Sequence, residues 1–201
     1  MLTVVCLNWH NYRGRGDVWV TKLRNMVERN LTIPHAFVEV TERDLPPGRI
    51  GWFNKLSLLE MFDGDVLYLD LDIVITANIN HVVERLYENR SLIWARDDWS
   101  YSIVNPRSGR EATINSSVML WSGRQDMSGV TDEMLLKTHG DQGIISQLFW
   151  PHRIGLLPEE SIQSYRYGLL MRDEPPAPIV VFHGEPKPDL CWDEFVLEHW
   201  L

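Results

Sequence analysis

Residues 66–75, "VLYLDLDIVI", have the composition of a buried β-strand but include two carboxylates separated by one leucine. Strand side chains alternate between faces, so Tyr68, Asp70 and Asp72 share one side if the run stays extended. Two neighbouring like charges repel, and a buried unpaired carboxylate usually takes a proton, a partner or a metal. We therefore expect positive charge close to both aspartates.

A simpler interpretation ends the strand at Asp70. Both aspartates would then lie in a solvated turn, or they would cap the helix indicated by "ANINHVVERLYEN", residues 77–89. For an isolated D-x-D pattern this interpretation is the better one, so other parts of the chain have to decide.

Length and composition are typical of one globular domain over residues 1–201. The chain is 44% hydrophobic and 10% aromatic, which excludes disordered and fibrous classes. Nineteen basic against 28 acidic residues give a net charge of −9. This charge disfavours sequence-independent binding to nucleic acid or to an anionic membrane. Cys6 and Cys191 have neither metal-binding nor disulfide spacing, so we expect both to be reduced and structural.

The amino-terminal sequence "MLTVVCLNW" lacks the positive region of a signal peptide. No uninterrupted apolar run reaches the length of a transmembrane segment. We therefore expect a cytoplasmic protein.

Strand-like apolar runs alternate with segments of helical period, which favours an α/β sheet with helices on its faces. The predicted strands are residues 2–8, 35–40, 65–70, 91–97, 116–121 and 178–183, and the predicted helices include residues 51–62, 77–89 and 192–201. The strands at 91–97 and 116–121 are candidates for an antiparallel excursion. In the last helix the residues spaced to pack inward are Trp192, Phe195, Val196, His199 and Trp200.

Residues with useful chemistry follow two of these strands. In open α/β sheets ligands bind at the carboxyl ends of strands, where Asp70 and Asp72 close one run and His183 closes another. Two carboxylates and an imidazole suit a divalent cation, Mn²⁺ or Mg²⁺ rather than zinc. In the following "GEPKP", Gly184 permits close backbone approach and Lys187 adds positive charge, a combination that suits a phosphate.

Four pieces of the sequence form an ordered combination across residues 55–188: "KLSLLEMFDGDVLYLDLDIVITANI", "INSSVMLW", "HGDQGIIS" and "FHGEPKP". The combination resembles the retaining glycosyltransferases with the GT-A fold, of the glycogenin and lipopolysaccharide galactosyltransferase type. The pieces are similar to that family's lysine-leading helix with its aspartate-x-aspartate strand, its asparagine-serine-glycine strand, its aspartate-glutamine helix start and its carboxy-terminal histidine, glycine and lysine-proline element. In this sequence His183 and Gly184 are adjacent, whereas the family usually places the histidine three residues ahead of the glycine. Ser117 stands where the family usually has glycine.

The resemblance implies a single GT-A, Rossmann-like α/β domain with a mixed, mostly parallel central sheet flanked by helices. It implies metal-dependent transfer of a hexose from a nucleotide-sugar, with a UDP-sugar as the expected donor, and retention of anomeric configuration. It assigns the Mn²⁺ or Mg²⁺ ion to Asp70, Asp72 and His183, donor binding to Leu7, Asn8, Trp9, Lys55, Asp70, Gly184 and Lys187, and the region of the reacting sugar to Asn115, Asp141 and Gln142.

Two other functions remain open at this stage. "LDLDIVIT" fits the nucleophile motif of haloacid-dehalogenase-type phosphatases, but that motif normally opens its domain, and Ile145 stands where a later aspartate is expected. The chain could also be a non-catalytic module that binds sugar-nucleotides or glycans, although the acidic residues, Gln142 and Lys187 are all present. The acceptor is not specified: a glycan, a protein side chain, a small molecule and a modified nucleic-acid base all remain candidates.

Overall fold

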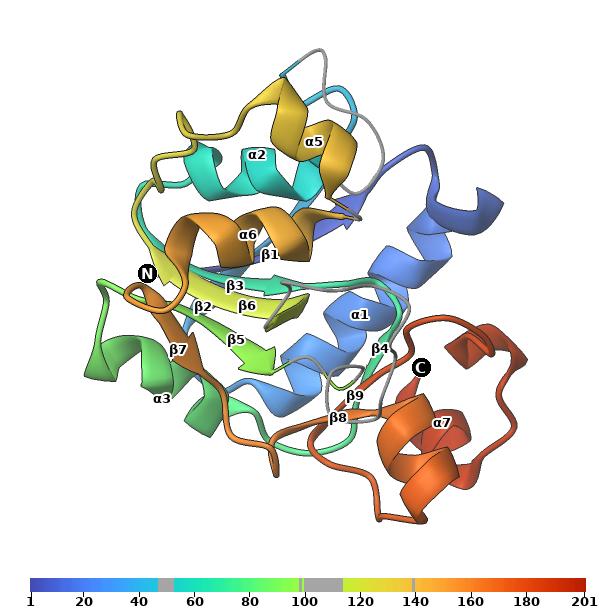
Figure 1. Cartoon of the computed structure of the whole chain (residues 1–201). Helices are drawn as coiled ribbons and strands as arrows, with labels where there is room; N and C mark the ends of the chain where they lie inside the picture. The colour runs from blue at the N-terminus through green and yellow to red at the C-terminus, as the bar shows by residue number, and fades with distance from the viewer. Residues whose placement is uncertain (47–52, 98, 100–113, 139) are drawn as a thin grey trace.

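The computed structural model describes residues 1–46, 53–97, 99, 114–138 and 140–201. Its largest element is a six-stranded sheet in the order β2-β1-β3-β6-β5-β7 (Figure 1). The strands are β1 (Leu2–Asn8), β2 (His35–Thr41), β3 (Asp65–Leu69), β5 (Ile93–Asp97), β6 (Ile114–Ser122) and β7 (Ile154–Leu156). Strand β6 pairs antiparallel with β3 and β5, while the other described pairs in this sheet are parallel. The prediction of a mixed, mostly parallel sheet with an antiparallel excursion is confirmed.

Helices cover both faces of this sheet (Figure 1). Those packed on it are α1 (Gly16–Asn30), α2 (Asn54–Met61), α3 (Asn80–Glu88) and α6 (Asp141–Phe149), and the chain also contains α5 (Asp132–Lys137) and α7 (Glu194–His199). Alternation along β3 divides the core, because Leu67 and Leu69 pack with α1 and α3 while Val66 and Tyr68 pack with α2 and α6. The two core clusters hold the sheet between its helices, as the α/β prediction requires.

The predicted strand that runs through Asp70 and Asp72 is interrupted. Strand β3 ends at Leu69, and a separate strand, β4 (Ile73–Ile75), begins after Asp72. Strand β4 pairs antiparallel with β9 (Ile179–Val181), which pairs in parallel with β8 (Ile162–Ser164). These three strands form a second sheet in the order β4-β9-β8. The strand predicted at 178–183 therefore lies outside the central sheet.

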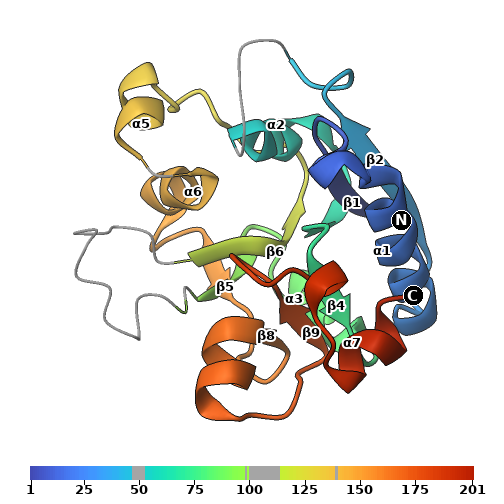
Figure 2. The same cartoon turned by 90° about the vertical axis from the view of Figure 1, so that its right-hand side faces the viewer.

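The carboxy-terminal segment packs on α1, as Figure 2 shows. The Trp200 ring meets that of Trp19 edge to face at 5.0 Å, and Lys22 Nζ donates to the Trp200 carbonyl at 3.0 Å. The predicted inward position of Trp192 is wrong, since this residue is 84% exposed. Helix α7 begins only at Glu194, so helical spacing does not apply to Trp192.

Two expectations from composition can be compared with the structure. Cys6 and Cys191 are both buried and free, as predicted. Among the described residues, no helix combines the length and the apolar character needed to cross a membrane.

Candidate functional site

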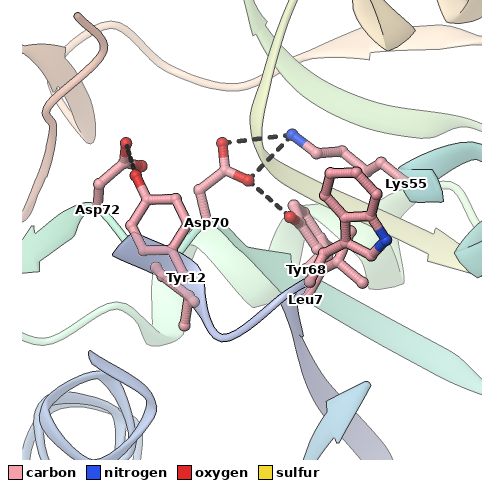
Figure 3. Close-up of a pocket in the computed structure, with 8 residues that line it drawn as sticks. Leu7, Tyr12, Lys55, Tyr68, Asp70 and Asp72 are labelled. Carbon is pink, nitrogen blue, oxygen red and sulfur yellow. Dashed lines mark hydrogen bonds and ion pairs between the residues drawn. The ribbon is translucent and has the colours of Figure 1, made fainter. Parts of the chain in front are cut away.

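A pocket of about 250 Å³ lies at the carboxyl ends of β1 and β3 (Figure 3). This is the position where α/β sheets bind ligands. The pocket is lined by Leu7, Trp9, Tyr12, Lys55, Tyr68, Asp70, Leu71 and Asp72. Five of these were predicted as site residues: Leu7, Trp9, Lys55, Asp70 and Asp72.

The break between β3 and β4 positions both aspartates. The backbone N–H of Asp70 donates to the Ser117 carbonyl of β6 at 2.9 Å, and the Asp72 carbonyl accepts from the Phe182 N–H at 3.0 Å. The two side chains are only 24% and 13% exposed, respectively. The strand ends as in the simpler interpretation, but the aspartates line a pocket and do not lie in a solvated turn.

Asp70 is paired with a lysine from α2. Lys55 Nζ lies 3.0 Å from Asp70 Oδ1, which also accepts a 2.6 Å hydrogen bond from the Tyr68 hydroxyl (Figure 3). Lys55 is buried, which by itself lowers the pKa of its ammonium group, but Asp141 and Asp70 outweigh burial and raise this pKa above its ordinary value. Burial and Asp70 also raise the pKa of Tyr68, so its hydroxyl stays a donor.

Asp72 has a different lysine. Its Oδ2 accepts a hydrogen bond from Lys187 Nζ and another from the Tyr12 hydroxyl at 3.1 Å. Lys187 also donates to the Phe182 carbonyl at 2.7 Å, which ties this lysine to the end of β9. Burial and the charge of Asp70 raise the pKa of Asp72 above its ordinary value, although Lys187 and Tyr12 act in the opposite direction. The positive charges expected beside the two aspartates are therefore present, one lysine for each.

Asp141 joins this network from behind Lys55. It is the first residue of α6, where a carboxylate is favoured by the helix dipole, and it is only 5% exposed. Ser116 Oγ donates to Asp141 Oδ2 at 2.6 Å, and Lys55 Nζ lies 3.5 Å from the same oxygen. Lys55 thus bridges Asp70, at the pocket, and Asp141, beneath it.

Asn8, Asn115 and Gln142 are among the predicted residues that do not line the pocket. The Asn8 side chain donates to Glu39 Oε1 at 2.7 Å and accepts from the Tyr12 N–H at 2.9 Å, so it shapes the loop after β1. Asn115 Oδ1 accepts from the Ser117 N–H at 3.0 Å within β6. Gln142 follows Asp141 in α6 and is half-buried.

Gly184 and His183 follow β9. Gly184 has a φ of +78°, a conformation that favours glycine, and is exposed. His183 Nε2 lies 2.6 Å from Ser164 Oγ, and its ring stacks on Trp99 at 5.6 Å and 8°. Within the described part of the chain, no three His, Cys, Asp or Glu side chains form a group that could hold a metal. The structure therefore brings Asp70 and Asp72 together but does not add His183 to them as a third ligand.

The carboxylate oxygens of Asp70 and Asp72 are candidate ligands for a divalent cation. Two carboxylates offer the hard oxygen ligands that Mg²⁺ and Mn²⁺ prefer. The network around them joins three carboxylates, Asp70, Asp72 and Asp141, to only two ammonium groups, those of Lys55 and Lys187. Asp70 and Asp72 therefore fit such an ion, while the Nε2 atom of His183 is already engaged by Ser164.

Sequence reasoning missed Tyr12, Leu71 and Ser116 as site residues. Tyr68 was placed on the same strand face as Asp70, so its contact could have been found from strand alternation. Tyr12 lies in a basic stretch that has the composition of a solvated loop, and no local spacing connects it with Asp72, 60 residues away.

Known proteins were compared with this chain by sequence and by structure. No protein-family model matches it, and no curated protein matches it. An active-site mutant of LgtC matches in structure with a TM-score of 0.65 and 15% identity, over 98% of this chain and 93% of that one.

Other glycosyltransferase structures match as well. The galactosyltransferase LgtC, in complex with donor and acceptor sugar analogs, matches with a TM-score of 0.59 and 17% identity. The match covers 96% of this chain and 90% of that one. GlyE from Streptococcus pneumoniae TIGR4 gives 0.63 at 16% identity, over 98% of this chain but 60% of GlyE. The bifunctional glycosyltransferase WbbM gives 0.64 at 13% identity, over 93% of this chain and 46% of WbbM. This chain therefore has the GT-A fold of these glycosyltransferases, as its sequence predicts.

Proposed function

We propose that this protein is a metal-dependent glycosyltransferase that moves a hexose from a UDP-sugar to an acceptor with retention of anomeric configuration. The observation that carries the proposal is the pair of lysine-bound carboxylates, Asp70 and Asp72, at the carboxyl end of β3. They lie in a pocket of a chain whose fold is that of glycosyltransferases.

Asp70 and Asp72 would hold Mn²⁺ or Mg²⁺. The ion would supply positive charge to the leaving diphosphate. Lys187 already lies at Asp72, so its ammonium group is close enough to add to that charge. A charge that is held in place before the bond breaks stabilises the transition state without reorganisation.

The remaining pocket surface suits the nucleoside. Leu7, Trp9 and Tyr12 provide apolar and aromatic surface on which a base can stack. The ring of Tyr12 is held in place, since its hydroxyl donates to Asp72 and the ring makes an edge-to-face contact with that of Trp19 at 5.3 Å. Gly184, in the loop that carries Lys187, permits close approach of backbone to the diphosphate.

Asp141 would orient the hydroxyl groups of the donor sugar. Ser116 and Lys55 both bind the same oxygen of Asp141, which restrains this carboxylate and leaves it poorly placed for covalent attack. We therefore favour front-face substitution, in which the departing phosphate oxygen takes the proton of the acceptor hydroxyl. Gln142, next to Asp141, and Asn115 would lie around the reacting carbon.

The acceptor is proposed more broadly. LgtC has been solved with donor and acceptor sugar analogs, which supports a sugar acceptor for a chain of the same fold. A modified nucleic-acid base is the alternative acceptor. Location in the cytoplasm and a single domain over residues 1–201 both stay predictions.

The deciding experiment is a screen of nucleotide-sugars for Mn²⁺-dependent hydrolysis, because slow hydrolysis needs no acceptor. We expect one donor to be turned over, and we expect a chelator to stop the reaction. Turnover that is unchanged without metal would overturn metal dependence. Hydrolysis of small phosphate esters without any sugar transfer would favour the phosphatase, and donor binding without turnover would favour the non-catalytic module.

A further inference from the structure

His183 is held from two directions. Its Nε2 lies 2.6 Å from Ser164 Oγ, and its ring stacks almost parallel to that of Trp99. The ring of Tyr167 lies 5.2 Å away on a tilted plane. Whichever tautomer the imidazole adopts, its Nε2 atom is engaged with a hydroxyl group that is itself fully buried.

Ser164 connects His183 to an unusual helix. It is the last residue of β8 and the N-cap of a π-helix, Tyr165–Leu170, where its Oγ also accepts from the Tyr167 N–H at 3.0 Å. π-Helical turns are rare and often occur at functional sites. The same serine thus fixes both the start of this helix and the imidazole beside it.

His183 also lies at the base of the loop that carries Lys187. Lys187 Nζ donates to the carbonyl of Phe182, the residue before His183, and to Asp72. On the outer side of this loop, Glu185 Oε1 accepts from Arg13 at 3.0 Å. The position of the Lys187 ammonium group therefore depends on where residues 182–187 are held, and the half-buried imidazole, in contact with the buried Ser164, is the anchor of that segment.

We propose that His183 is a positioning residue that fixes the Lys187 loop through Ser164, Trp99 and Tyr167, and that it is not a metal ligand in this chain. The inference deepens the proposed function and rests on it, because the lysine that is positioned is the one assigned to the diphosphate. Ligation through Nε2 would require the imidazole to give up its hydrogen bond to Ser164. The adjacency of His183 and Gly184, which departs from the family's spacing, fits this different role.

Two variants remove the same hydrogen bond from opposite ends. His183→Phe keeps a ring for the stack on Trp99, and Ser164→Ala leaves residue 183 unchanged. His81→Phe is the matched control, since His81, on α3 and outside the pocket lining, makes a similar 2.9 Å contact from its Nε2 to Ser161 Oγ. Binding of Mn²⁺ alone is followed by electron paramagnetic resonance, and hydrogen exchange reports the loop amides, which are those of Gly184, Glu185 and Lys187 because Pro186 has no N–H.

We expect Mn²⁺ affinity to change less than about twofold in both variants, while exchange of the loop amides becomes at least about fivefold faster. The kcat for donor hydrolysis should fall at least about fivefold in each variant. When the same substitutions are made together with Lys187→Ala, kcat should fall less than about twofold further, because the effect passes through that lysine. His81→Phe should change none of these.

Three results would overturn the inference. These are a tenfold loss of Mn²⁺ affinity in His183→Phe, unchanged exchange of the loop amides in both variants, or an equal fall in kcat with and without Lys187. If the unmodified protein neither binds Mn²⁺ nor turns over a donor, the proposed function fails instead. The exchange measurement then still decides whether His183 fixes the loop.

Discussion

Substitution of Lys55 by methionine tests the charge network at the pocket. Methionine has a similar length but no charge, so Lys55→Met removes the cation from two carboxylates at once. Breaking a buried ion pair by removing one partner costs about 3–5 kcal/mol, because the other charge stays buried. Asp70 is partly exposed and keeps its Tyr68 bond, and Asp141 keeps Ser116, so we expect the lower end, about 3 kcal/mol.

Equilibrium unfolding in urea measures this loss directly. For a chain of this size 3 kcal/mol corresponds to a fall in melting temperature of roughly 6–12 °C. The matched control is Lys137→Met, which removes a pair with Glu133 on a helix surface where the lysine side chain is 74% exposed. Exposed pairs contribute about 0.3–0.5 kcal/mol, so this control should be nearly silent. A free energy of unfolding for Lys55→Met within about 1 kcal/mol of the unmodified protein would refute the view that Lys55 is the buried counter-ion of Asp70 and Asp141.

Three further predictions concern turnover of the donor. Asp72→Asn should abolish metal-dependent hydrolysis, which chelator titration checks. Its free energy of unfolding in urea should stay within about 1 kcal/mol of the unmodified protein, since loss of the Lys187 pair is offset by relief of repulsion from Asp70. Lys187→Ala should lower kcat at least about tenfold, or about 1.4 kcal/mol, with Lys137→Ala as the exposed control, and an unchanged rate at saturating donor would remove this lysine from catalysis. Asp141→Asn should slow transfer heavily but leave residual activity with the anomeric configuration retained, as read by proton NMR of the fresh product. Complete loss of transfer would instead indicate that Asp141 is a nucleophile, and an inverted product would exclude retention.

The central sheet could be predicted because its strands carry their own signal. The apolar runs of β1 and β3 are long enough for strand character to be visible, and residues 51–62, which contain α2, have helical period. Electrostatics added the expectation of a cation near each aspartate, which holds for Lys55 and Lys187. These inferences need only local pattern or the general cost of burying a charge.

The second sheet and its contacts could not be predicted in the same way. Strands β4, β8 and β9 have three residues each, too few for a period of two to be visible. The hydrogen bond from Ser164 to His183 and the ion pair between Lys187 and Asp72 depend on how β9 lies between β4 and β8. The register of such short strands is fixed by tertiary packing, so a histidine with the position of a ligand in the sequence turns toward a serine in the structure.

The polar groups of the pocket already satisfy one another, and this limits how a ligand can enter. Lys55 is shared by Asp70 and Asp141, while Lys187 is shared by Asp72 and a backbone carbonyl. Under the proposed function, a cation can bind Oδ2 of Asp72 only if Lys187 moves away from this oxygen, and a diphosphate gives the Lys187 ammonium group a new partner. Cation and diphosphate should therefore favour each other's binding, since each removes a cost that the other would face alone. A lysine that serves as counter-ion before the donor arrives, and as a phosphate ligand afterwards, needs a loop held at its base, which is the place that His183 occupies.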